Sequence, residues 1–223
     1  MVGVYSIHSK KRNLFFSNLS LNGLFILINV LSFILFSILI YSNANFLDFI
    51  AIKPGNILHG KYIWTFLTSM FMHAGFFHLF VNMLSLFFVG GLIEKILGAK
   101  RYLYFYLISG LFAGLFFVLS SFIFPASIEM YAVGASGALF GLIGFLMLIT
   151  PNLSVYIMFI PIPIKMKYAA PGMLVVLWLI SIAGNVPIGN TAHLGGLIAG
   201  LCYGFYLRKK YKRKTRLISE HFS

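Results

Sequence analysis

Long runs without a charged residue constrain this chain more than any other feature of its sequence. No charged residue occurs between Arg12 and Asp48, and residues 21–41 alone give about 20 apolar positions, enough to cross the hydrocarbon core of a bilayer. Further charge-free runs lie within 61–94, 101–129, 129–165 and 167–208. With 60% hydrophobic and 9% charged residues, the chain cannot be an ordinary water-soluble globule. We therefore predict a multi-pass integral membrane protein.

Turn residues inside these runs set the predicted number of spans. The run 167–208 encloses 40 uncharged residues, too many for one helix, and the turn-rich segment 184–190 divides it in two. The fourth run should end as a helix near Pro151, because proline lacks an amide proton and clashes with the preceding turn. The sequence therefore predicts an all-α bundle of six transmembrane helices.

The basic residues are distributed unevenly between the two ends of these spans. In a six-span arrangement 15 of the 17 Lys and Arg residues fall on one side, and only Lys53 and Lys61 fall on the other. The positive-inside rule then places both termini in the cytoplasm. We expect a single domain, 1–223, with a helical core at about 15–207 and a basic cytoplasmic tail, 208–223.

The tail and the cysteine content limit the partners of the chain. We interpret the basic tail as the topology signal, with contact to anionic lipid as an addition, and we predict no nucleic-acid partner. Cys202 is the only cysteine, so the chain can form no internal disulfide and no thiolate metal site. We predict neither a metal nor a cofactor.

Four polar residues interrupt the apolar runs at similar depths. Counted at about 1.5 Å per residue from the inner end of each run, His78, Ser136 and His193 all lie roughly 22–24 Å away, and Asn82 lies one turn deeper than His78. This distance places them several ångströms below the outer face of a core about 30 Å thick. An ionisable residue inside a membrane is energetically expensive, so its first interpretation is functional.

Each of these residues has an ordinary structural interpretation when it is taken alone. A Gly-x-Ser-Gly segment in a membrane helix usually indicates close packing, and a single buried His or Asn usually bonds a neighbouring helix. Their occurrence together favours chemistry, because a serine beside a histidine is a nucleophile beside its base. Small residues spaced by four, in the rows 137–141 and 196–204, would let two helix backbones approach closely.

These residues resemble the motifs of the rhomboid family of intramembrane serine proteases. The resemblance is detailed over about 64–205, and 90–98 resembles the family's end of the second helix. It is carried by His73-x4-His78-x3-Asn82, Gly134-Ala135-Ser136-Gly137 and Ala192-His193-x2-Gly196. The resemblance implies a six-helix bundle of rhomboid type and a serine endopeptidase that cleaves transmembrane proteins within the lipid bilayer.

The resemblance also assigns roles to individual residues. It implies that Ser136 is the nucleophile and His193 the general base of a dyad, which agrees with the lack of any carboxylate inside the spans. It implies that His78, Asn82 and the Ser136 amide stabilise the oxyanion.

Residues around this dyad are expected to shape the cavity. The resemblance gives His73, Gly134, Gly137 and Phe140 structural or cavity-lining roles, and the Phe140 ring could stack on His193. The chain departs from the family pattern in two places. Thr65 follows the first-loop Trp64 where an arginine is frequent, and Phe140 stands where a tyrosine is frequent.

The fifth predicted helix is the candidate gate for a substrate helix. It is bulky around Trp178 and lacks a row of small residues, so we expect it to pack least tightly. We predict an endopeptidase of the cell membrane. A catalytically inactive rhomboid-like protein that binds membrane clients is one alternative. A transporter with a histidine proton relay is another, although no inverted repeat or intramembrane carboxylate supports it.

Overall fold

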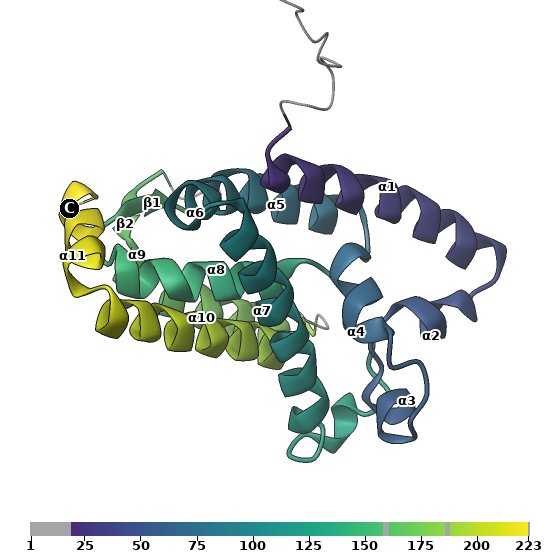
Figure 1. Cartoon of the computed structure of the whole chain (residues 1–223). Helices are drawn as coiled ribbons and strands as arrows, with labels where there is room; N and C mark the ends of the chain where they lie inside the picture. The colour runs from purple at the N-terminus through teal and green to yellow at the C-terminus, as the bar shows by residue number, and fades with distance from the viewer. Residues whose placement is uncertain (1–18, 158–160, 186–187, 223) are drawn as a thin grey trace, which may run out of the picture.

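The computed structural model describes residues 19–157, 161–185 and 188–222 (Figure 1). Lys10, Lys11 and Arg12, the start of the predicted core at 15–18, and part of the predicted turn 184–190 lie outside the described residues. Where it is described, the chain is mostly helical, as predicted. A short antiparallel pair of strands, β1 (Ser154–Tyr156) and β2 (Pro163–Lys165), joins two of the long helices.

The helices fall into a long set and a short set. The long set is α1 (Leu21–Ser42), α5 (Phe76–Ser85), η2 (Leu86–Gly90), α6 (Gly91–Leu97), α7 (Ala99–Ser120), α8 (Ser136–Ile149), α9 (Met166–Ala183), α10 (Asn190–Lys210) and α11 (Lys212–His221). The segments α5, η2 and α6 form one continuous helix whose middle is π-helical. The short set between α1 and α5 is α2 (Phe46–Ile50), α3 (Pro54–Leu58), α4 (Thr65–Thr68) and η1 (Ser69–Phe71), and η3 (Pro125–Ser127) follows α7.

Four of the described helices are long and apolar enough to cross a membrane, namely Leu21–Ser42, Phe76–Leu97, Ala99–Ser120 and Met166–Ala183. They coincide with the first, second, third and fifth predicted spans. The fourth predicted span corresponds to α8, which is apolar but has only 14 residues. The sixth corresponds to α10, whose 21 residues include His193 and four glycines that dilute its hydropathy. The chain is thus a helical membrane protein, and the count of six spans stays a prediction.

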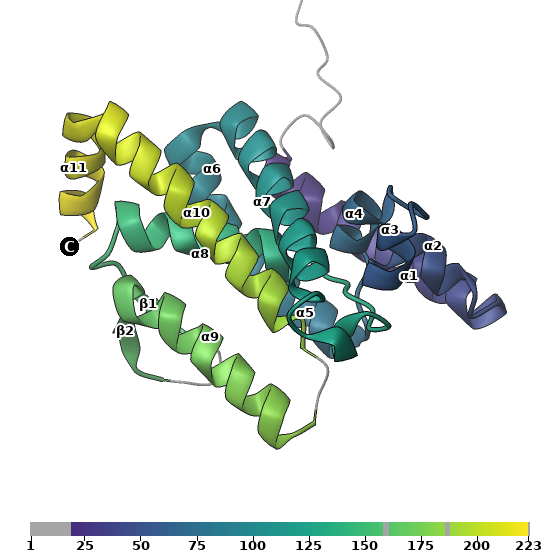
Figure 2. The ribbon, with the colours of Figure 1, turned by 90° about the horizontal axis from the view of Figure 1, so that it is seen from below.

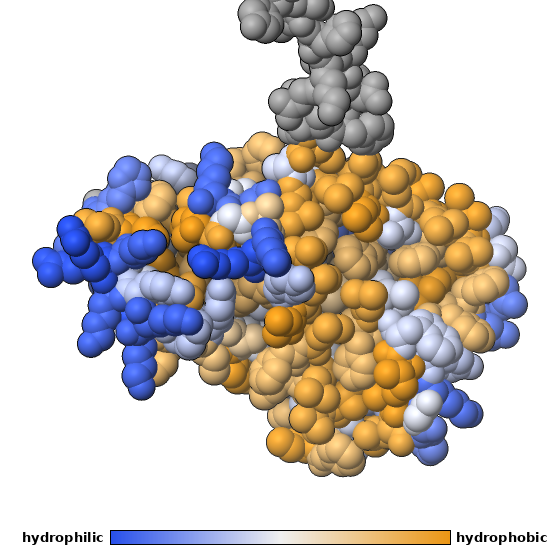
Figure 3. Space-filling view, in the orientation of Figure 1, coloured by the Kyte–Doolittle hydropathy of each residue, from blue (hydrophilic) through white to orange (hydrophobic). Residues whose placement is uncertain are grey.

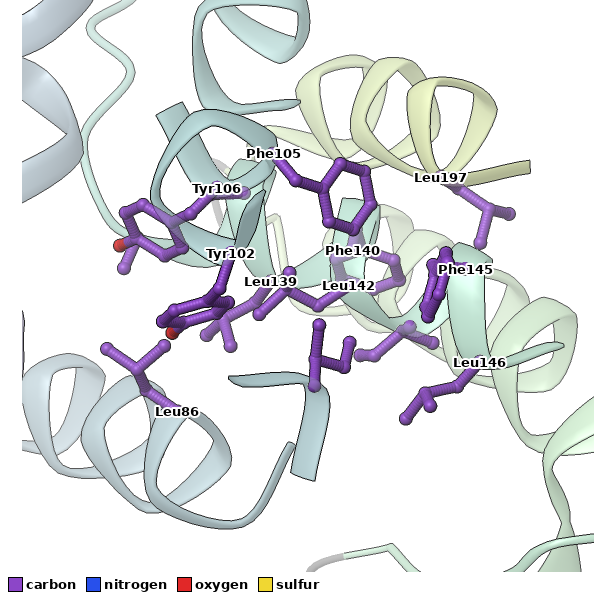
Figure 4. Packing of buried hydrophobic residues seen from close by; sticks show 14 of the residues in the cluster. Leu86, Tyr102, Phe105, Tyr106, Leu139, Phe140, Leu142, Phe145, Leu146 and Leu197 are labelled. Atoms are coloured by element: carbon purple, nitrogen blue, oxygen red, sulfur yellow. The ribbon is translucent and has the colours of Figure 1, made fainter. Parts of the chain in front are cut away.

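Helix α8 is short because it forms the centre of the bundle. Of its 14 residues, 11 are buried, so it faces protein on all sides. Aromatic residues of α7 (Tyr102, Phe105 and Tyr106) and Leu197 of α10 pack around it (Figure 4). The helix ends before Pro151, as the sequence predicted.

Helices α8 and α10 touch through their backbones. A side-chain carbon added at Gly196 would collide with the Gly137 carbonyl oxygen, and one added at Gly200 would collide with the Gly141 carbonyl oxygen. The two helices run side by side in both ribbon views (Figures 1 and 2). The predicted rows of small residues are therefore the surfaces along which these helices meet.

A polar network fixes α1 to the bundle. The Glu94 carboxylate accepts hydrogen bonds from the Leu21 and Asn22 amides at 3.0 and 2.8 Å, which satisfies two of the unpaired donors at the start of α1. The Asn22 side chain donates to the Leu86 carbonyl at 2.9 Å and accepts from the Tyr102 hydroxyl at 2.7 Å. Glu94 thus joins α1 to α6.

Candidate active site

Ser136 and His193 meet where two helices begin. Ser136 is the first residue of α8, and His193 lies in the first turn of α10. The Ser136 Oγ and the His193 Nε2 are 2.7 Å apart, a hydrogen-bond distance, although 57 residues separate them in the chain. When the His193 Nε2 carries no proton, the Ser136 hydroxyl donates its hydrogen bond to this nitrogen. The contact can then transfer the serine proton to the histidine.

The surroundings of His193 fix its ring without a carboxylate. The Phe140 ring, one turn after Ser136, stacks on the imidazole with ring centroids 4.6 Å apart and planes 20° apart. The His193 Nδ1 is buried and makes no hydrogen bond to the described residues. Within the described part of the chain the Ser136–His193 contact thus has no third polar member, and aromatic stacking and helix packing orient the ring.

His78 lies against the backbone that leads into the serine. Gly134 has φ +120°, a conformation that side chains rarely adopt. A side-chain carbon added there would be 2.8 Å from the His78 Cε1, 3.0 Å from its Nε2 and 3.6 Å from the Ser136 Oγ. The glycine thus gives the room that lets the imidazole edge approach Ser136.

The protonation of His78 follows from its other contact. The Ala74 amide donates to the His78 Nδ1 over a long distance of 3.4 Å, which assigns the proton of a neutral ring to Nε2. This nitrogen is the one that faces Gly134. The His78 Nε2–H group is thereby a hydrogen-bond donor close to Ser136.

Asn82 and His73 support the same helix end. The Asn82 side chain is buried, and its Nδ2 donates to the His78 carbonyl at 2.8 Å, so one of its two protons is used inside α5. His73 is fully buried and meets the His78 ring edge-on, with ring centroids 5.1 Å apart. The structure therefore places His73 against His78. Among the described residues no hydrogen bond joins His73 or Asn82 to Ser136 or His193.

The segment before Ser136 is held by the region between α1 and α5. Ile52 and Ala132 form an antiparallel bridge, with N···O distances of 3.1 and 2.8 Å, and the Gly134 amide donates to the Ser69 carbonyl at 2.8 Å. An ion pair of 2.6 Å joins Lys53 to Glu129 and raises the pKa of the lysine. The sequence interpretation missed these contacts, because short-range patterns give no sign of which loops pair.

Trp178 lies on a helix that packs loosely at one end. The prediction that this helix packs least tightly is wrong, because 11% of the apolar stretch of α1 is buried against 22% for α9. The buried residues of α9 are Met166, Ala169, Ala170 and Leu174, all in its first ten residues. Trp178 is 37% exposed, and the helix lies on the outside of the bundle (Figure 2).

Within the described residues no cluster of three or more His, Cys, Asp or Glu side chains could hold a metal ion.

Comparison with known proteins points to one family. Residues 60–210 match the family model described as Rhomboid domain. RHOMBOID-like protein 1 of Arabidopsis thaliana is 38% identical over 159 residues, which cover 70% of this chain and 37% of that protein. Rhomboid protein 1, mitochondrial, of Saccharomyces cerevisiae is 30% identical over 156 residues, covering 66% and 43%. Inactive RHOMBOID-like protein 8 of Arabidopsis thaliana is 36% identical over 140 residues, covering 61% and 36%. The matched part of the chain spans less than half the length of each of these relatives.

Proposed function

The chain belongs to the rhomboid family, and we propose that it is an active intramembrane serine endopeptidase that cleaves single-span proteins in or next to their transmembrane segments. The observation that carries the proposal is the 2.7 Å contact between the Ser136 hydroxyl and the His193 imidazole at the partly buried meeting point of α8 and α10.

The first half of the reaction forms an acyl-enzyme. The Ser136 Oγ attacks the scissile carbonyl carbon while its proton moves to the His193 Nε2. The negative charge that develops on the carbonyl oxygen is stabilised by the Ser136 backbone amide, which has no intrahelical acceptor at the start of α8, and by the His78 Nε2 proton. Asn82 contributes its remaining amide proton. Collapse of this intermediate breaks the carbon–nitrogen bond, and His193 protonates the departing amine.

The second half of the reaction consumes water. His193 takes a proton from a water molecule that attacks the ester carbon, and the proton returns to the Ser136 Oγ as the ester bond breaks. The proposal requires that water reach the dyad from the outer side, where His78, Ser136 and His193 offer it hydrogen bonds. No cofactor takes part in either half.

A client-binding protein without activity is the alternative from another functional class. It is favoured by the relative named inactive, which is 36% identical to this chain. The two functions are separated by incubating the purified protein in vesicles with a single-span substrate, alongside its Ser136→Ala variant. Cleavage by the parent protein alone supports the protease.

We propose further that the whole chain, 1–223, forms one rhomboid-type domain of six spans with both ends in the cytoplasm. The support is the 15-to-2 division of the basic residues and the burial of α8, which lets a 14-residue helix serve as a central span. We place the protein in the cell membrane, with a mitochondrial membrane as the alternative because a relative is named mitochondrial.

This topology predicts the accessibility of Asn43, which follows α1. An Asn43→Cys variant in a Cys202→Ala background should react with a membrane-impermeant maleimide in intact cells, because residue 43 would face outward. A Ser219→Cys variant in the same background serves as the matched inner-face control and should react only after the cells are opened. The reverse pattern would invert the topology.

The gate proposal predicts a substrate-dependent effect at Trp178. Replacing it with alanine should change the cleavage of a transmembrane substrate several-fold, while cleavage of a short soluble peptide changes little. The two substrates should differ because a gate restricts the lateral entry of a helix and leaves the dyad intact. Rates for both substrates would be measured with the same preparation, with Tyr168→Ala, an exposed residue at the other, packed end of α9, as a control that should change neither rate. Equal losses on both substrates would end the gate proposal.

A further inference from the structure

The last helix of the chain folds back onto the body of the protein. Helix α10 ends at Lys210, Tyr211 leaves the helical conformation with φ −126° and ψ 49°, and α11 begins at Lys212. Ile218 of α11 packs against the main core, so the helix is docked and does not project away from the bundle. Figure 1 shows α11 at the same end of the molecule as α6 and the two strands.

Hydrophilic residues gather at this end of the molecule, whereas the middle of the face in view is apolar (Figure 3). Between α11 and the end of α8 lies a cavity of about 300 Å³. Cationic and hydroxyl side chains line one side of it and apolar residues line the other. The lining comprises Leu148, Ile149, Pro151, Arg208, Lys212, Thr215, Arg216 and Ser219.

The charges in this cavity are not balanced by the protein. Arg216 forms an ion pair of 2.8 Å with Glu220, one turn further along α11. Arg208 and Lys212 have no ion-pair or hydrogen-bond partner for their cationic groups within the described residues. Two cations therefore converge on one cavity with no anion of the protein between them. A phosphate group suits such a site, because guanidinium and ammonium groups bind it through charge-assisted hydrogen bonds.

An apolar hollow lies on the other side of the same helix. It measures about 420 Å³ and is lined by Leu92, Lys95, Ile96, Leu217, Ile218, His221 and Phe222. Its lining residues come mainly from α6 and α11, and α6 is the last segment of one of the four candidate membrane spans. Helix α11 therefore has a cationic cavity on one face and an apolar surface on the other, at the level where a span ends, which is where lipid headgroups meet acyl chains.

We propose that α11 and the end of α8 form a binding site for an anionic phospholipid. Arg208 and Lys212, with Arg216, hold its phosphate, and the apolar wall of the same cavity, Leu148, Ile149 and Pro151, holds the first part of an acyl chain. Bound lipid would fasten α11 across the ends of α6 and α8. The site is independent of the proposed protease activity, because it uses none of the residues near Ser136.

The test compares two double variants that remove the same charge. The protein in detergent is titrated with phosphatidylglycerol, and the bound lipid is counted by native mass spectrometry. We expect Lys212→Gln with Arg216→Gln to weaken binding about tenfold or more, because charge-assisted hydrogen bonds to the phosphate are lost. Arg213→Gln with Lys214→Gln, on the same helix but outside the cavity lining, should leave binding within about twofold of the parent.

Three results would overturn the proposal. Equal weakening in both double variants would show a diffuse electrostatic attraction and no site. Equal binding of phosphatidylcholine with the same acyl chains would show that the anionic headgroup is not recognised. Competition by glycerol phosphate as tight as that of the lipid would remove the role of the cavity's apolar wall. Thermal unfolding of each variant, measured without lipid, should match the parent and excludes loss of folding as the cause.

Discussion

Replacing Ser136 with alanine should abolish cleavage of a transmembrane substrate, lowering the rate by about 10⁴-fold or more. The substitution removes the hydroxyl that lies 2.7 Å from the His193 Nε2 and leaves a small side chain at the start of α8, where the fold should tolerate it. His193→Ala should cost a similar factor, because the hydroxyl would have no base. Cleavage by purified protein in vesicles is the measurement.

The double variant gives the sharper result. Since one covalent step needs both side chains, Ser136→Ala with His193→Ala should be little worse than either single change. A fluorophosphonate probe should label Ser136 in the parent and not in His193→Ala. If the loss in the double variant equalled the product of the two single losses, the residues would act independently. Cleavage by pure Ser136→Ala protein at the parent rate would exclude the protease and favour the client-binding protein.

Neighbouring residues should have graded effects in the same assay. Asn82→Ala should lower the rate by about 10²-fold or less, because it removes one oxyanion donor among several and that donor already shares its amide with the His78 carbonyl. His73→Ala should cost less than His193→Ala, because His73 contacts His78 and not the dyad. The size of each loss thus distinguishes residues that support the site from residues that take part in the reaction.

The site could be anticipated from the sequence because membranes make polar residues conspicuous. His78, Ser136 and His193 stood out at one depth, and the small residues that bring α8 against α10 were visible as a repeat. Both signals depend only on spacing along a helix. The structure places Ser136 and His193 in contact, whereas it commits one amide proton of Asn82 to its own helix.

Contacts between distant irregular segments could not be predicted in this way. The Ile52–Ala132 bridge joins two loops whose pairing depends on the folded bundle, and Glu94 caps a helix that begins 73 residues earlier. The π-helical stretch Leu86–Gly90 also carries no sequence signal, although its first carbonyl, that of Leu86, accepts the Asn22 side chain. Such features depend on tertiary packing and not on a local pattern.

Gly196→Ala should lower activity about 10²-fold while much of the fold is retained. A methyl group at this position would collide with the Gly137 carbonyl oxygen, which is backbone and cannot rotate away. Helix α8 must then move from α10, and Ser136 and His193 are attached to the same two helix ends. A misplacement of about 1 Å between reacting groups is enough for a loss of this size.

The matched control is Gly172→Ala in α9, where an added side-chain carbon would meet nothing within 4 Å. This variant should cleave substrate at the parent rate. For Gly196→Ala we expect overpacking to cost about 1–3 kcal/mol of stability, measured by thermal unfolding in detergent. The decisive measurement is fluorophosphonate labelling of the folded fraction, which should slow together with cleavage. Labelling at the parent rate, with only cleavage impaired, would show that the dyad survives the added methyl and that the close contact of α8 with α10 is not what sets its geometry.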